Sequence, residues 1–150
     1  MTRLVEQDEV GSQDFTRKIV IVLAAHLASW EALNTVAHLS AYLGNKMRER
    51  FESGSAFVTK DGKPHPRNSQ FPIILLSAKP AQIKRLIEVA RDAGLLYHAF
   101  IREMLETSDD EEIVQILSNK LDEEVECLGI GMFGKKEELN TLTKKFSLWK

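Results

Sequence analysis

The run at residues 18–23, KIVIVL, constrains the fold more than any other part of the sequence. Five aliphatic residues follow the lysine without a polar break, so a strand formed here must be buried on both faces. A second run of this kind, PIILL, stands at residues 72–76. Two such strands predict a sheet that is covered by helices on both sides.

Amphipathic helices alternate with the predicted strands. After the first strand, Leu33, Leu39 and Leu43 recur at helical spacing, and Ser29 is expected to cap a helix that reaches Phe51. Further helices are predicted from residue 80 to a stop at Gly94, at 109–120 and at 135–142, and further strands at 95–101 and 124–132. This order predicts a three-layer α/β/α fold around four strands.

The length of 150 residues fits one domain, which we place at residues 15–150. Residues 1–14 are polar and are predicted to form a flexible tail.

The stretch at residues 52–71 is rich in Gly, Ser, Pro and Lys. Its Asp61-Gly62 pair predicts a tight turn, with residues 56–58 as the first arm of a hairpin. Pro64 and Pro66 oppose a long second arm, because proline cannot donate to a strand ladder.

The chain has one cysteine, Cys127, which cannot form an internal disulfide, so a reducing compartment is the expectation. The longest apolar run, Ile19–Ala25, is seven residues long, whereas a membrane span needs about 20. No apolar segment marks the N-terminus as a signal peptide. We therefore expect a cytoplasmic protein that has no membrane partner.

The net charge of −2 hides an uneven distribution. Residues 46–91 carry 10 basic and 4 acidic groups, whereas residues 92–126 carry 2 basic and 11 acidic groups. A sequence pI of about 6.1 opposes a generally basic nucleic-acid binder. The segment 46–91 still allows a contact with RNA, and the opposite charges allow self-association. Ordinary solvated helix faces explain the same pattern.

Candidate site residues lie around the turn after the first strand, where ligands bind in open α/β sheets. On a helical wheel Trp30, Asn34 and His38 share a face that points away from the apolar stripe. His26, in the turn itself, can act as a general acid or base. The alternative interpretation of this polar stripe is a solvated face, or one that packs on residues 52–71.

The sequence Gly129-Ile130-Gly131-Met132-Phe133-Gly134 spells G-x-G-x-x-G. Gly129 and Gly131 could let backbone amides approach a ligand, or could permit close packing of a helix on the sheet. No strand and acid follow as a dinucleotide site requires, because the chain ends 16 residues later. The histidines lack metal-ligand spacing, and we predict neither a cofactor nor a metal.

These motifs resemble two protein families. Residues 18–23, WEALN at 30–34, the Asp61-Gly62 loop with Pro64-His65-Pro66, and PIILL at 72–76 are similar to the bacterial proteins catalogued as domain of unknown function 2000. More distantly, ARDAGL at 90–95, IRE at 101–103 and LGIG at 128–131 resemble type 2 peptidyl-tRNA hydrolases. The resemblance covers about residues 16–149.

The hydrolase resemblance implies a four-stranded mixed sheet with one antiparallel strand. It also implies cleavage of the ester between a peptide and tRNA by a Lys before the first helix, a Gln on it and an Asp after the third strand. Here Ser29, Trp30 and Glu31 occupy the region of the Lys, and Asn34 matches the Gln. His38 lies one residue beyond the family's His, and Glu103 replaces the Asp.

Three functional hypotheses follow from these residues. The first is a small or nucleotide-like ligand bound near Trp30 and Asn34, with His26 as acid or base and Glu103 as a carboxylate partner. The second is a non-enzymatic module, in which the polar stripe and residues 52–71 form a homodimer or other protein interface. The third is genuine peptidyl-tRNA hydrolysis, ranked last because the catalytic cation is missing.

Overall fold

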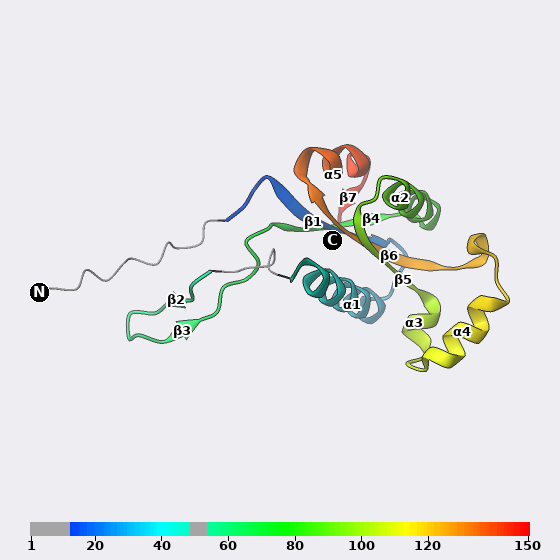
Figure 1. Cartoon of the computed structure of the whole chain (residues 1–150), viewed down its shortest axis with the longest axis horizontal. Coiled ribbons are helices and arrows are strands. Elements are labelled where there is room, and N and C mark those ends of the chain that lie inside the picture. The colour runs from blue at the N-terminus through cyan, green and yellow to red at the C-terminus, as the bar shows by residue number, and fades with distance from the viewer. Residues whose placement is uncertain (1–12, 49–53) are drawn as a thin grey trace, which may run out of the picture.

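The computed structural model describes residues 13–48 and 54–150. Its centre is a five-stranded mixed sheet in the order β5-β6-β1-β4-β7 (Figure 1). The central strand β1 (Arg17–Ala24) runs parallel to β4 (Ile73–Ala78) and antiparallel to β6 (Cys127–Lys135). β6 in turn pairs antiparallel with β5 (Leu96–Ile101).

Helices cover both faces of this sheet, which confirms the predicted α/β/α layers. α2 (Pro80–Asp92) and α5 (Lys136–Thr143) lie on one face, and α1 (Ser29–Met47) covers the other (Figure 1). The link between β5 and β6 forms α3 (Arg102–Glu106), α4 (Asp110–Ser118) and the 3-10 turn η2 (Asp122–Glu124). The sequence pattern predicted α4 but missed the single turn of helix in α3.

The predicted count of four strands is wrong. A fifth strand, β7 (Ser147–Leu148), forms the edge of the sheet by pairing antiparallel with β4, and the Trp149 N–H donates a hydrogen bond to the Leu75 carbonyl. Two paired residues are too few to show the alternation that identifies a strand.

The central strand is buried as its sequence predicts. Residues 19–24 all expose 2% of their surface or less, because α1 covers one set of alternate side chains and α2 with α5 the other. β1 therefore forms the middle of the apolar core, and its carboxyl end leads directly into the turn that carries His26.

Two predicted helix caps differ in detail. Ala28, not Ser29, precedes the first turn of α1, and the Glu31 carboxylate accepts the Ala28 N–H. At α4 the carboxylate of Asp109 accepts from the N–H groups of Glu111 and Glu112, so Asp109 takes the place of Ser108 as cap. In both cases an acidic side chain satisfies an N–H group that the helix leaves free.

Two expectations fall partly outside the described residues. Of the predicted tail 1–14, only residues 13 and 14 are described, and the predicted helix end at Phe51 is not.

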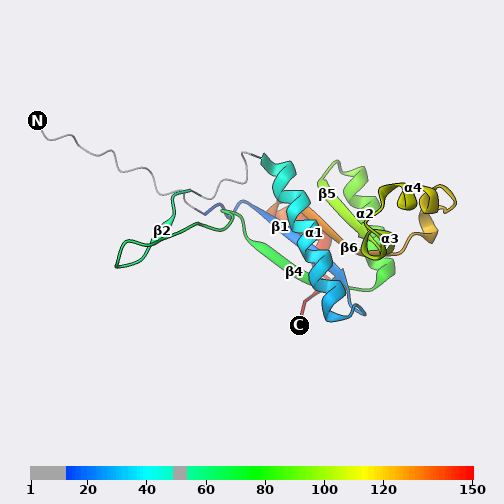
Figure 2. The ribbon, with the colours of Figure 1, turned by 90° about the horizontal axis from the view of Figure 1, so that it is seen from below.

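The predicted hairpin is present and projects from the body of the domain (Figure 2). β2 (Phe57–Val58) pairs antiparallel with the short β3 (Pro64–His65), as the prolines indicated. Gly62 takes the positive φ of 84° that its turn requires. Among the described residues, the helices are all too short or too polar to cross a membrane.

Candidate functional site

Two hollows flank α1 on its face of the sheet. The first, the aromatic pocket, lies between α1, β5 and the α3–α4 segment and has a volume of about 910 Å³. It is lined by Asn34, His38, His98, Phe100, Met104, Leu105, Glu106, Thr107, Ser108, Asp110, Ile113 and Val114. Asn34 and His38 are the members that the sequence pattern singled out.

Three aromatic rings, those of His38, His98 and Phe100, line the aromatic pocket, and a fourth, Tyr42, packs against His98 outside the lining. His38 stacks on Phe100 with ring centroids 5.0 Å apart, and Tyr42 stacks on His98 at 4.1 Å. Asn34, His38 and Tyr42 recur every four residues on α1, while His98 and Phe100 alternate along β5, so each set shares one face of its element. The two periodicities bring the rings into register.

The imidazole of His98 is the half-buried polar group of this wall. Burial lowers the pKa of His98 below its ordinary value, and the nearby His38 lowers it further. The ring is therefore neutral at neutral pH. A neutral imidazole offers one donor and one acceptor nitrogen, which suits recognition of a polar ring edge.

The outer rim of the aromatic pocket is acidic. Glu106 and Asp110 line it, and none of the described lining residues is a lysine or an arginine. Because like charges repel across a partly desolvated pocket, a phosphate group is disfavoured there. A neutral or cationic ligand fits the electrostatics better.

A network of ion pairs fixes the neighbouring turn. Arg102 donates to Glu31 at 2.7 Å and to both carboxylate oxygens of Glu126 at 2.9 and 3.0 Å. Nε2 of His26 lies 3.7 Å from Glu126. Hydrogen bonds from Arg102 lower the pKa of Glu31 and of Glu126, and the same bonds raise that of Arg102. The network anchors α3 to the start of α1 and to the residue before β6.

Sequence reasoning missed three members of this network. Glu31 and Arg102 are 71 residues apart, and a single sequence carries no signal that pairs them. Glu126 ends the acidic segment 92–126, and nothing in the sequence pairs it with Arg102.

Glu103 points away from the aromatic pocket. Its side chain is buried and accepts from Lys120 at 2.5 Å, while its second carboxylate oxygen has no hydrogen-bond partner among the described residues. Burial works to raise the pKa of Glu103, but the hydrogen bond and charge of Lys120 outweigh it, so the pKa lies below its ordinary value. The ion pair joins α3 to the end of α4.

The structure thus separates the residues that were expected to share one site. His26 belongs to the ion-pair network, and Glu103 pairs with Lys120. The indole of Trp30 is 63% exposed, and Trp30 lines neither hollow beside α1. Only Asn34 and His38 come together in the aromatic pocket.

Gly129 and Gly131 lie in the core beneath α1 and line neither hollow. A Cβ at Gly129 would stand 3.0 Å from the Val22 carbonyl oxygen, and one at Gly131 would stand 2.9 Å from the Leu43 side chain. The glycines therefore let α1 approach β6 closely, as the alternative interpretation of the motif proposed. Burial raises the pKa of Cys127 at the start of the same strand, so its thiol stays protonated.

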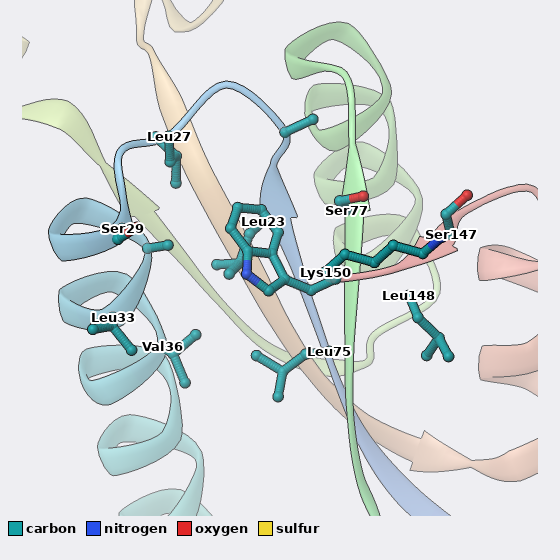
Figure 3. A pocket seen from close by; sticks show the side chains of 13 residues that line it. Leu23, Leu27, Ser29, Leu33, Val36, Leu75, Ser77, Ser147, Leu148 and Lys150 are labelled. Carbon is teal, nitrogen blue, oxygen red and sulfur yellow. The ribbon is translucent and has the colours of Figure 1, made fainter.

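The second hollow, the apolar groove, lies on the other flank of α1 and has a volume of about 800 Å³. Figure 3 shows Leu33 and Val36 of α1 facing Leu75 of β4 across it. Leu33 is 71% exposed and Leu148 is 64% exposed.

Comparison with known proteins relates the chain to a sequence family and to a solved structure of similar fold. The family described as "Protein of unknown function (DUF2000)" matches residues 17–150. A solved structure of a protein of unknown function, Atu0240 from Agrobacterium tumefaciens strain C58, superimposes with a TM-score of 0.78 at 20% identity. The alignment covers 91% of this chain and 100% of that one. No curated protein matches.

Proposed function

We propose, for a chain that belongs to the DUF2000 family of proteins of unknown function, that it binds a small planar ring compound in the aromatic pocket. The observation that carries the proposal is that the rings of His38, His98 and Phe100 and the Asn34 amide line one hollow, with His38 stacked on Phe100. Flat ligands bind well against such ring faces. The hollow has the size of an ordinary small-molecule site.

The polar groups of the aromatic pocket narrow the ligand class. Asn34 offers two donors and an acceptor, neutral His98 offers one of each, and Ser108 adds a hydroxyl. The Thr107 hydroxyl donates to Glu112 instead. Such mixed groups match the edge of a nucleobase or a similar heterocycle. Because Glu106 and Asp110 repel phosphate, the expected ligand is a nucleobase or nucleoside and not a nucleotide.

Catalysis forms no part of this proposal. His26 and Glu103 line neither hollow beside α1, and Arg102, the cation close to the start of α1, is engaged by two carboxylates. Peptidyl-tRNA hydrolysis and an RNA contact through residues 46–91 stay predictions.

Calorimetric titration with adenosine, guanosine, cytidine and uridine tests the proposal. We expect saturable binding of at least one nucleoside, and weaker binding of its 5′-monophosphate. Asn34→Ala and His38→Ala should each weaken binding about tenfold, the loss of one good hydrogen bond or ring contact. Asn45→Ala and His65→Ala are matched controls, because both residues are exposed and lie outside the pocket.

Two results would contradict the proposal. One is that none of the four nucleosides and none of their free bases binds the wild-type protein. The other is binding that is unchanged by Asn34→Ala and His38→Ala together.

The apolar groove favours a second candidate function, homodimerisation. Its exposed leucines, Leu33 and Leu148, form a surface of the kind that monomers usually cover. A second copy is the expected occupant, because the basic segment 46–91 and the acidic segment 92–126 give identical chains complementary surfaces. Sedimentation velocity should then show a dimer that Leu33→Asp dissociates, and a wild-type monomer at all concentrations would contradict it.

A further inference from the structure

A third hollow lies on the opposite face of the sheet, between α2 and α5. This cleft has a volume of about 330 Å³, and its floor is apolar. Leu86 is buried there, while Val89, Leu142 and Phe146 are half-buried and keep part of their surface accessible. The floor is therefore a short aliphatic and aromatic trough that water covers when no ligand is bound.

The rim of this cleft is cationic. Arg85 stands on α2, and Lys144 and Lys145 follow the last turn of α5. No carboxylate lines the cleft, and among the described residues none of these three cations takes part in an ion pair or hydrogen bond. By contrast, Arg102 and Lys120 elsewhere in the domain are both engaged by carboxylates.

The position of Arg85 distinguishes this cleft from a helix C-terminus that simply carries basic residues. Lys144 and Lys145 stand at the C-terminus of α5, where the helix dipole favours cations. Arg85 lies in the middle of α2, where the dipole gives no such reason. Arg85 lines the same hollow as the two lysines, so basic residues border it from α2 and from the end of α5.

We infer that this cleft binds a free aliphatic carboxylate, with the hydrocarbon chain along the apolar floor and the carboxylate at Arg85, Lys144 and Lys145. The match is between an anion joined to an apolar chain and cations beside an apolar trough. A membrane surface is a poorer match, because the large apolar side chains that are exposed in the described residues all lie outside the cleft. The small volume suits a medium-length chain.

Titration of the isotope-labelled full chain with octanoate, followed by NMR, tests this inference. Octanoate should give saturable shifts at Leu142 and Phe146. 1-Octanol, which has the chain without the charge, and acetate, which has the charge without the chain, should each bind at least about tenfold more weakly. Equal binding of octanoate and acetate, or of octanoate and octanol, would overturn the inference.

Charge-removing variants locate the effect. The double variant Arg85→Gln/Lys144→Gln should weaken octanoate binding about fivefold, the loss expected of two exposed ion pairs. The matched control Lys60→Gln/Lys63→Gln removes two exposed charges from the hairpin and should leave binding unchanged. Equal losses in the two double variants would contradict a site in the cleft.

A vesicle experiment separates a free ligand from a lipid surface. The protein should not cosediment with vesicles of phosphatidylglycerol and phosphatidylcholine. Cosedimentation without octanoate binding would overturn the assignment. The adenosine titration reports on the other face of the sheet, so each proposal stands or fails by itself.

Discussion

The two flanks of α1 differ sharply although they share one helix and one sheet face. On the β5 flank, the aromatic pocket has ring walls and a polar, acidic rim. On the β4 flank, the apolar groove is lined mainly by aliphatic side chains and lies open beside the two-residue strand β7 (Figure 3). The two flanks differ because of the segment that follows β5. The 25 residues 102–126 link β5 to β6 and form one wall of the aromatic pocket.

This contrast teaches where specificity arises in the domain. α1 supplies a polar stripe to one flank and leucines to the other, and opposite α1 the first flank has the rings of β5 and the carboxylates of the α3–α4 segment. The ion pairs of Arg102 and Glu103 hold that segment in place. The open flank offers the exposed Leu33 and Leu148 together with serine hydroxyls, a mixture of apolar and polar surface that suits a partner surface.

The largest expected effect comes from the buried side of α1, which lies between the two hollows. Leu39 lies on the buried side of α1 and is fully buried, so Leu39→Ala should lower the free energy of unfolding by about 2–5 kcal/mol and disturb both hollows together. Urea denaturation followed by circular dichroism measures the loss. A loss no larger than that of Leu33→Ala would contradict the burial of Leu39 between α1 and the sheet.

A smaller loss is expected where α1 approaches β6. Gly129→Ala places a Cβ 3.1 Å from Cγ2 of Thr35 on α1 and 3.0 Å from the Val22 carbonyl oxygen on β1, and such overpacking should cost about 1–3 kcal/mol. Gly44→Ala is the matched control, because its Cβ meets nothing within 4 Å. In the helix this change should stabilise by about 0.5–1 kcal/mol. The same sign for both changes in denaturation would refute the close approach.

The pocket flank alone is expected to respond to mild acid. The lowered pKa of His98 means that the unfolded chain takes up this proton first, so stability falls as the pH drops below 6.5, the ordinary histidine value. His98→Phe should keep the stack on Tyr42 and flatten this dependence in thermal unfolding. His65→Phe, in the exposed hairpin, should leave it unchanged. A pH dependence that survives in His98→Phe would count against this assignment.

The smallest effect on stability belongs to the open flank. Leu33 is 71% exposed, so Leu33→Ala should change the free energy of unfolding by no more than about 0.5 kcal/mol. Its nucleoside affinity should equal that of the wild type, as calorimetry can show. Reduced nucleoside affinity in Leu33→Ala would contradict the assignment of the ligand to the β5 flank.

The sequence predicts much of this architecture because a strand that is buried on both faces is recognisable as an unbroken run of aliphatic residues. The runs at 18–23 and 72–76 identified β1 and β4, and the stripe of Asn34 and His38 identified one wall of the aromatic pocket. The opposite wall was missed. His98 lies in the predicted strand 95–101, but its meeting with Tyr42 depends on the register of β5 with β6.

The charged residues were harder to place for a different reason. Arg102 and Glu103 are neighbours in sequence, yet their side chains leave a short helix about 100° apart and find different partners. The sequence thus indicated that Glu103 lies in the segment of a site, but it did not show in which direction its side chain points. The apolar groove left no sequence signal either, since Leu33 fits the helical core spacing but stands exposed.

An NMR titration with adenosine tests the central claim most directly, with signals from both flanks of α1 read in one experiment. The account predicts saturable shifts at Asn34, His38 and His98, while Leu33 and Leu148 stay unmoved. Shifts confined to Leu33 and Leu148 would contradict it and assign the ligand to the apolar groove.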